Sequence, residues 1–396
     1  MNRFRNSVQL WKPIACIFLT VLIGAGVFLI ISSQRADKDP AEDPVDGPQP
    51  PVTVPTRAEL TLAEMTDWEK VCQLFVVHPT QLSGTSRQKT ADYSLIQALS
   101  EYPVGGLIYD GDNIADPDQL RALLEDVAGC CAIAPIQTLD EEGGRVSRLK
   151  DLRSVAINAM YSYRNDGTLT AFSNAETIGN DIKFFGFNVD LAPVADVWSN
   201  PQNTVIGNRA YSDDYQQAAE LIKAAVEGFH SAGVGCTLKH FPGHGDTRED
   251  SHSSAAYVTK TLEELRREEL LPFAAGIEAG ADMVMMGHLT VTDISSQPAL
   301  FSYQIVTELL REELGFNGVI ITDGLEMKAV TSLYSSSEIV LKAFEAGVDM
   351  FLSPNNFRTA VQALYDALEN GTISQERLDQ SVLRILELKE RYGLLD

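Results

Sequence analysis

The chain has 396 residues, a formal net charge of −24 and a pI of about 4.6. This net negative charge excludes a broad nucleic-acid-binding surface and non-specific electrostatic binding to anionic lipid. Its five cysteines show no CxxC spacing, which excludes a zinc ribbon. We expect them to serve mainly as small buried apolar groups, with one disulfide if the domain is exported.

The N-terminus has the composition of a membrane segment. Residues 1–12 carry three basic side chains and no acid, and residues 13–32 are almost wholly apolar. About 20 apolar residues can cross a bilayer as a helix, and preceding positive charge keeps the N-terminus in the cytoplasm. We favour a single-pass anchor over a cleaved signal peptide, whose apolar region is usually about 7–15 residues long. The rest of the chain is then extracytoplasmic at the cell membrane, or secreted if the segment is cleaved.

Residues 33–60 are rich in proline and acidic side chains, which predicts a disordered spacer without a packed core. From residue 61 to residue 396, short apolar runs alternate with amphipathic stretches. The runs predict strands at 72–77, 105–109, 134–139, 188–192, 235–238, 282–286, 319–322 and 348–352. The stretches predict helices at 118–128, 215–232, 262–279, 302–314, 337–346, 358–369 and 374–392.

Eight strands with helical crossovers indicate an α/β protein with one (β/α)8 barrel of the TIM type. An open doubly wound sheet is the alternative, but no glycine-rich dinucleotide turn follows the first strand. In such barrels, functional side chains lie at the carboxyl ends of the strands. The polar residues at those positions are Asp140, Glu141, Glu142, Arg145, Asp190, Asp196, Lys239, His240, His288 and Asp323.

The most informative stretch is KHFPGHGDTREDSH, residues 239–252. It follows a buried strand and holds three of the six histidines in the chain. Imidazoles beside carboxylates suit proton transfer or metal binding. The two glycines, Gly243 and Gly245, let the loop bend, so that its groups can move when substrate binds.

A single carboxylate, Asp323, directly follows the apolar run at 319–322. At the mouth of a barrel it can attack an anomeric carbon or stabilise positive charge there. We expect Glu326, three residues later, to lie on the surface or at a helix start.

Four segments resemble glycoside hydrolase family 3, in its NagZ-like β-N-acetylhexosaminidase branch. They are LDEEGGRVSRL, NTVIGNRAYS, KHFPGHGDTREDSH and GVIITDGLEM, in this order along the barrel. The resemblance implies a retaining exo-β-N-acetylglucosaminidase that removes terminal β-linked N-acetylglucosamine, typically from peptidoglycan fragments. Its substrate would be an amino-sugar oligosaccharide or a muropeptide. It needs no cofactor, metal or nucleic acid, and we expect a monomer.

The resemblance also implies roles for individual residues. Asp323 corresponds to the nucleophile, His252 to the general acid/base, and Asp250 to the group that orients His252. Sugar-hydroxyl ligands are implied at Asp140, Arg209, Lys239 and His240, and His288 is a further candidate for substrate binding.

Two positions depart from the family pattern. Glu141 replaces a glutamine found in many relatives, and Gly324 replaces a second acid. Neither removes a group that the mechanism needs, although they can alter subsite preference. The β-glucosidases of the wider family take their acid/base from a second domain, whereas this chain carries the histidine loop.

Two other functions compete with this prediction. One is a metal-dependent hydrolase, whose ligands would come from His240, His244, Asp246, Asp250 and His252, but a Gly-Pro loop is a poor scaffold for a metal. The other is a non-catalytic protein that binds cell-wall sugars on the same barrel. Chitooligosaccharides and glycoprotein glycans are alternatives to the muropeptide as substrate.

Overall fold

We analysed a computed structural model, which describes residues 54–153, 155–247 and 256–395. From Val54 on, the chain forms one compact unit. Among these described residues no helix is both long and apolar enough to cross a membrane. The predicted span at 13–32 and the spacer up to residue 53 lie outside them.

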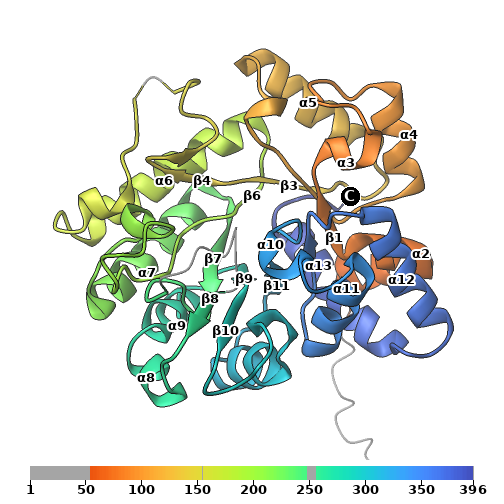
Figure 1. Cartoon of the computed structure of the whole chain (residues 1–396). Coiled ribbons are helices and arrows are strands. Elements are labelled where there is room, and N and C mark those ends of the chain that lie inside the picture. Colours follow the sequence, from red (N-terminus) through yellow and green to blue (C-terminus); the bar gives the residue numbers. More distant parts are fainter. Residues whose placement is uncertain (1–53, 154, 248–255, 396) are drawn as a thin grey trace, which may run out of the picture. The chain divides into compact units, whose positions relative to one another are not determined.

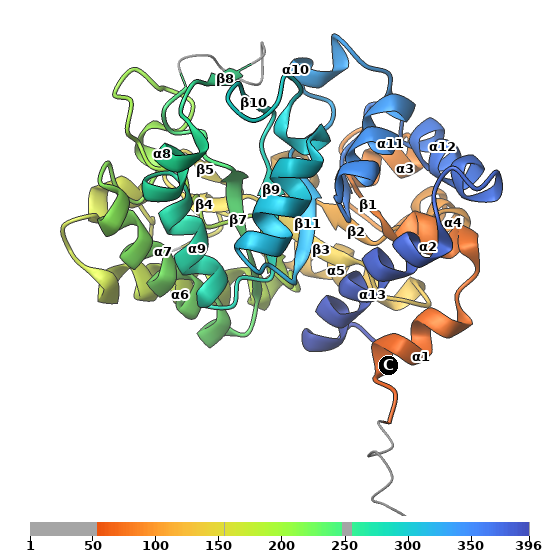
Figure 2. The same cartoon turned by 90° about the horizontal axis from the view of Figure 1, so that it is seen from below.

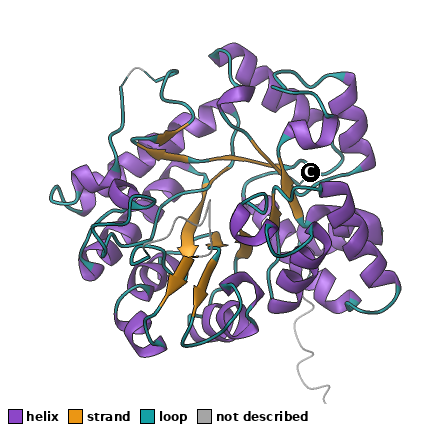
Figure 3. Ribbon diagram, in the orientation of Figure 1, coloured by secondary structure: helices purple, strands orange, loops and turns teal. Residues whose placement is uncertain are grey.

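The described residues form a sheet of eight parallel strands surrounded by helices (Figure 1, Figure 3). Its strands are β1 Phe75–Val77, β2 Gly106–Ile108, β3 Ile136–Leu139, β6 Val189–Asp190, β7 Gly235–Phe241, β9 Met283–Met286, β11 Val319–Thr322 and β12 Phe351–Leu352. Two small two-stranded sheets pair β4 Glu141–Gly143 with β5 Val146–Ser147, and β8 Ala256–Val258 with β10 Leu289–Val291.

Neighbours in the large sheet follow chain order, which is the topology of a (β/α)8 barrel. The first strand pairs with the last, with Phe75 opposite Phe351. The remaining gap, between β11 and β12, is bridged where Ile321 pairs with Met350. There the Thr322 N–H donates to the Met350 carbonyl at 3.0 Å. The predicted barrel is therefore confirmed.

Helices cover the outside of the barrel. They are α1 Arg57–Glu64, α2 Asp67–Gln73, α3 Pro79–Ser83, α4 Tyr93–Glu101, α5 Pro117–Cys130, α6 Thr168–Phe185, α7 Tyr215–Ala232, α8 Leu262–Arg267, α9 Leu270–Glu278, α10 Lys328–Thr331, α11 Ser336–Ala346, α12 Phe357–Glu369 and α13 Gln375–Arg391. A π-helix, η5 Gln304–Glu313, follows β10, and 3₁₀ turns lie at η1 Gly111–Asn113, η2 Met160–Tyr163, η3 Gly207–Arg209 and η4 Ala299–Phe301.

Local sequence signals set many helix ends. Thr66 and Glu69 form a reciprocal capping box at the start of α2. Gly233 ends α7 with a φ of 75°, a left-handed conformation that glycine adopts at low cost. This short helix α2 also corrects the prediction for the first strand, because it takes Cys72 and Gln73 and leaves the strand to begin at Phe75.

The predicted helix at 262–279 is two helices in the structure, with Glu268 and Glu269 between α8 and α9. Glu268 has φ −129° and ψ −95°, which are not helical angles. Both carboxylates turn toward Lys260, with oxygens 2.8 Å from its Nζ.

One continuous apolar core runs from Ala58 to Leu388. Where the barrel closes, the Phe75 and Phe351 rings pack 5.4 Å apart. Each such buried ring contributes about 1.5–3 kcal/mol through removal of apolar surface from water. The strand residues are buried in this core, and the polar groups of the strand ends follow directly on it.

Cysteine burial matches the expectation only in part. The four cysteines in the described residues are free thiols. Cys72 and Cys236 are buried, whereas Cys130 is exposed and Cys131 partly so. The Cys130 and Cys131 sulfurs lie 3.9 Å apart.

Candidate active site

A cavity of about 380 Å³ opens at the carboxyl ends of the barrel strands. Five of the predicted site residues line it, namely Asp140, Arg209, Lys239, His240 and Asp323. The other lining residues are Glu142, Arg145, Val146, Arg148, Thr204, Val205, Met285 and Leu352. A space of this size and polarity suits a small hydrophilic ligand.

Two carboxylates and two cations form a buried network along one wall of the cavity. Lys239 Nζ lies 2.6 Å from Asp140 Oδ1 and 2.7 Å from Glu142 Oε1. Arg209 donates two parallel hydrogen bonds to Glu142, each 2.8 Å long. Asp140 Oδ2 also faces Arg148 Nη2 at 3.4 Å. Bidentate pairs of this kind fix orientation as well as charge.

The charge states of this network follow from its contacts. Burial alone would raise the pKa of Glu142, but Arg209 and Lys239 outweigh it and hold that pKa well below its usual range. Burial alone would lower the pKa of Lys239, but Asp140 and Glu142 raise it above its ordinary value. Glu142 and Lys239 are therefore charged at neutral pH, and the network presents fixed hydrogen-bonding groups to a ligand.

A bulge in β7 explains why two consecutive side chains both reach the cavity. Lys239 pairs with Met285 and Phe241 with Met286, so His240 is an extra residue in the ladder. Successive side chains of a regular strand point to opposite faces, and a bulge re-aims one of them.

Asp196 fixes the imidazole of His240. The ring Nδ1–H donates to Asp196 Oδ2 at 2.7 Å, and Asp196 also accepts the backbone N–H groups of His240 and His244, at 3.1 and 2.6 Å. Burial raises the pKa of Asp196, but its attraction to His240 and these hydrogen bonds outweigh burial and lower it. This leaves Nε2 of His240 for the cavity.

Asp323 directly follows β11, and it is partly exposed through the cavity. Its Oδ1 accepts the Gly324 N–H at 2.8 Å. Burial alone would raise the pKa of Asp323, but attraction to His240 and His288 and the Gly324 hydrogen bond lower it. The carboxylate is therefore ionised and has the charge that a nucleophile needs.

His288 contacts Gly324, the residue that follows Asp323. Its Nε2–H donates to the Gly324 carbonyl at 2.8 Å, and His288 is not among the described residues that line the cavity. A direct contact between His288 and a substrate remains a prediction. Glu326 is exposed, as expected.

The family departure at Glu141 is explained by its surroundings. This fully buried side chain accepts from Arg153 Nη1 at 2.6 Å and from the backbone N–H groups of Arg148 and Leu149, at 2.6 and 2.9 Å. Arg153 neutralises the extra charge, and Glu141 does not line the cavity. Its contacts hold the β4–β5 turn that carries Glu142 and Arg148.

The predicted pair Asp250 and His252 lies outside the described residues. The preceding histidine, His244, is buried, and its Nδ1 lies 2.7 Å from Thr247 Oγ1. His240 and His244 have ring centroids 6.0 Å apart. Within the described ranges, these histidines and Asp246 do not form a cluster with metal-binding geometry.

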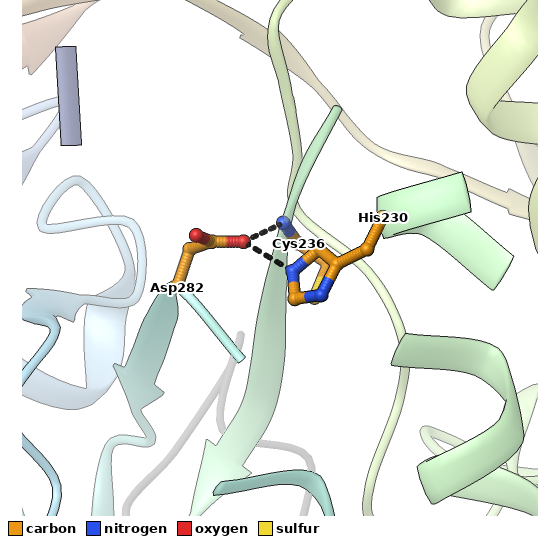
Figure 4. Close-up of side chains that lie close together, drawn as sticks. All are labelled: His230, Cys236 and Asp282. Atoms are coloured by element: carbon orange, nitrogen blue, oxygen red, sulfur yellow. Dashed lines mark hydrogen bonds and ion pairs between the residues drawn. The ribbon is translucent and has the colours of Figure 1, made fainter. Parts of the chain in front are cut away.

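A different His/Cys/Asp group lies at the opposite end of the strands (Figure 4). Ligand atoms of His230, Cys236 and Asp282 lie within 4.8 Å of one another. Asp282 already accepts from His230 at 2.9 Å, from Arg391 at 2.6 Å and from Tyr392 at 2.9 Å. Burial also raises the pKa of the Cys236 thiol well above its ordinary value. This neutralised cluster ties the end of α13 to the barrel and suits stability better than metal binding.

Some cavity residues were not predicted as ligands. Glu142, Arg145 and Arg148 line the cavity, and Asp196 orients His240. The first three lie in the segment LDEEGGRVSRL, so the signal was present in the sequence. Their directions depend on the tight turn after β4, where Gly143 and Gly144 have positive φ values of 85° and 61°.

A barrel with an ionised carboxylate, buried cations and an imidazole around one polar cavity has the site of a carbohydrate-active hydrolase. The chain matches the profile described as "Glycosyl hydrolase family 3 N terminal domain" over residues 66–388. It therefore belongs to glycosyl hydrolase family 3, which confirms the family expected from the four segments.

Named relatives agree with this assignment. "Beta-hexosaminidase A" of Pseudoalteromonas piscicida is 34% identical over 328 residues, which are 75% of this chain and 55% of that protein. "Beta-hexosaminidase" of Xylella fastidiosa is 36% identical over 260 residues, 64% of this chain and 77% of that protein.

Solved structures are similar as well. A glycoside hydrolase family 3 β-N-acetylglucosaminidase from Paenibacillus sp. has a TM-score of 0.79 and 36% identity, covering 83% of this chain and 63% of that one. A β-N-acetylhexosaminidase from Beutenbergia cavernae has a TM-score of 0.75 and 28% identity, covering 83% of this chain and 99% of that one. The chain thus spans about half to two thirds of the first relatives it resembles.

Proposed function

We propose that the protein is a retaining exo-β-N-acetylglucosaminidase that acts on amino-sugar oligosaccharides, with peptidoglycan fragments as its natural substrates. The observation that carries the proposal is Asp323, an ionised carboxylate at the end of β11 that lines the same cavity as the network around Lys239. The relatives named as β-hexosaminidases supply the sugar class.

In the first step, a carboxylate oxygen of Asp323 attacks the anomeric carbon and the bond to the leaving oxygen breaks. The leaving oxygen takes a proton from His252, oriented by Asp250. Asp140, Arg209, Lys239 and His240 bind the sugar hydroxyls, and Glu142 holds two of these ligands in place. Because their partners are fixed before substrate arrives, little reorganisation remains for the transition state.

In the second step, water attacks the anomeric carbon of the glycosyl-enzyme and His252 accepts its proton. The carboxylate of Asp323 leaves, and the sugar is released with its original anomeric configuration. Apart from the substrate, the two proposed steps use only side chains of this protein and water.

The experiment that tests the proposal is a panel of aryl β-glycosides. We expect the purified protein to hydrolyse 4-nitrophenyl N-acetyl-β-glucosaminide and to act far less on the corresponding glucoside. Release of the β-anomer first, seen by proton NMR, would support retention. No activity on any glycoside would favour a sugar-binding protein instead.

We also propose that the barrel is extracytoplasmic and held at the cell membrane through residues 13–32. The length of that apolar run and the basic residues before it support this location.

A further inference from the structure

Glu269 is a buried carboxylate that the proposed reaction does not use. It lies between α8 and α9, is 1% exposed, and does not line the cavity. Its Oε1 accepts from Lys260 at 2.8 Å, with Ser199 Oγ at 3.3 Å and Tyr215 OH at 3.4 Å. Among the described residues its Oε2 has no hydrogen-bond partner. Burying such a group is costly, so its position needs a reason.

Glu269 packs directly against the segment that follows β7. A Cβ atom added to Gly243 would lie 2.7 Å from Glu269 Cβ and 3.3 Å from Oε2. Gly243 also has a φ of 124°, which side-chain-bearing residues rarely adopt. The backbone at Gly243 therefore rests on Glu269, three residues after the cavity ligand His240.

Glu269 also fixes Lys260, which follows β8. Lys260 Nζ lies 2.8 Å from Glu269 Oε1, 2.8 Å from Glu268 Oε2, 2.8 Å from Tyr215 OH and 4.0 Å from Asp246 Oδ2. Its side chain is 14% exposed, so these contacts are little screened by solvent. Figure 2 shows β8 with β10 and α10 at one end of the barrel.

Residues 244–247, which follow β7, are held by asparagine side chains instead. Asn203 Nδ2 donates to the His244 carbonyl at 2.7 Å, and Asn200 Nδ2 donates to the Thr247 carbonyl at 3.2 Å. Thr247 and Lys260 are thus both anchored, one by two amides and the other by buried carboxylate Glu269.

We propose that Glu269 is a positioning residue that, by holding Gly243 and Lys260, fixes the two described flanks of the sequence that carries His252. The inference rests on the proposed role of His252 as general acid/base. Proton transfer to a leaving oxygen needs the donor within hydrogen-bond reach. A displacement of about 1 Å in such a group can cost about 10²-fold in rate.

Charge supports this role. Burial raises the pKa of Glu269 to about 7, against the attraction of Lys260. The charged and titratable groups that face it are Lys260 after β8, Tyr215 on α7, Glu268 at the end of α8, and Asp196 and Asp246 at the strand ends. Ionised Glu269 holds Lys260 more firmly than the neutral acid does, so the positioning strengthens as pH rises through about 7.

The test compares Glu269→Gln with Glu268→Gln in the full chain. Both carboxylates lie 2.8 Å from the same lysine, but the Glu268 side chain is 33% exposed while that of Glu269 is fully buried. The substrates are N,N′-diacetylchitobiose, whose leaving group needs a proton, and 4-nitrophenyl N-acetyl-β-glucosaminide, whose leaving group needs much less help. Circular dichroism checks that each variant is folded.

We expect Glu269→Gln to lower kcat/KM for the disaccharide by about tenfold to 10²-fold, and far less for the nitrophenyl glycoside. Its pH profile should lose part of the rise through about 7 that the unaltered protein shows. Glu268→Gln should resemble the unaltered protein in both respects, because exposed ion pairs contribute little. Equal effects of the two variants, or equal losses on both substrates by folded Glu269→Gln, would overturn the proposal.

A double-mutant cycle with Lys260→Met tests whether Glu269 acts through Lys260. We expect non-additive losses, with the double variant no slower than the slower single variant. Additive losses would contradict the role. If the unaltered protein hydrolyses neither substrate, the proposed function has failed; if it is active and Glu269→Gln matches it, only this inference has failed.

Discussion

Replacing Glu142 by glutamine tests whether this one carboxylate holds the cations of the site. The side chains of Glu142 and Lys239 are each 2% exposed and that of Arg209 is 10% exposed, so solvent cannot replace the lost charge. Removing one partner of a buried ion pair costs about 3–5 kcal/mol. Lys239 keeps Asp140 at 2.6 Å, but Arg209 loses its bidentate carboxylate partner, because glutamine offers one acceptor oxygen and puts an NH2 donor in place of the other. We therefore expect a loss of about 3–4 kcal/mol.

The assay is equilibrium urea unfolding at pH 7, followed by circular dichroism, with and without high salt. The matched control is Glu313→Gln, which breaks the Arg266–Glu313 pair. That pair is as short, at 2.6 Å, but its side chains are 43% and 39% exposed. We expect the control to lose about 0–1 kcal/mol, and salt to abolish even this. A loss below about 1 kcal/mol for Glu142→Gln would refute the reasoning, since the pair would then behave as a surface pair.

Four further outcomes are expected. Asp323→Asn should lower turnover by several orders of magnitude, and a 2-fluoro sugar that traps the glycosyl-enzyme should label Asp323 in the unaltered protein, as found by peptide mass spectrometry. His252→Ala should slow hydrolysis of a disaccharide far more than glycosylation by a nitrophenyl glycoside, with a pre-steady-state burst; equal slowing would make His252 a binding residue. Folded Glu269 keeps a proton that the unfolded chain has lost, so this group should remove about 3 kcal/mol of stability as pH rises from about 4.5 to about 7, and the stability difference between the unaltered protein and Glu269→Gln should change by that amount in urea titrations. Cell fractionation should find the full-length chain in membranes, and a soluble product starting near residue 36 would indicate cleavage.

The barrel was predictable because its strands lie in short apolar runs that recur between helical stretches, and several of these runs end at a polar residue. Parallel strands buried on both faces read as continuous apolar sequence, and β11 with its Asp323 is the clearest case. Strand starts were less certain. The capping box of Thr66 and Glu69 marks the start of α2, which continues to Gln73 and so includes Cys72. An apolar run alone cannot distinguish a helix end from a strand start.

The predicted helix at 262–279 was wrong in its middle for a physical reason. Its sequence has helical periodicity, but it also contains Pro272, four residues after Glu268. Proline has no N–H to donate to the Glu268 carbonyl and its ring clashes with that carbonyl, so one helix cannot run through both residues. Helix α9 instead starts at Leu270, which leaves Pro272 in its first turn, where proline is tolerated. The sequence therefore contained the signal for the break, whereas the contacts of Glu268 and Glu269 with Lys260 could not be predicted from it.

For the site, the positions of residues at the strand ends were predictable, but the directions of some side chains were not. Strand ends predict that Asp140, Lys239 and Asp323 meet at one mouth, and they line one cavity. The bulge at His240 and the inward turn of Glu142 were not predictable, because a one-residue shift in pairing reverses which side chains face the mouth.

Net charge, finally, says little about the electrostatics of this site. The chain has 55 acidic and 31 basic residues, yet the cavity is lined by four cations, Arg145, Arg148, Arg209 and Lys239, against three carboxylates, Asp140, Glu142 and Asp323. Charges within a few ångströms in a buried site outweigh a distant, screened surface, so the nearest groups decide the charge of Asp323. Burial raises the pKa of that carboxyl, but His240, His288, the Gly324 N–H and Lys239 together lower it despite the acidic chain. His240 and Lys239 therefore serve two ends at once, since groups that would bind sugar hydroxyls also keep the nucleophile ionised.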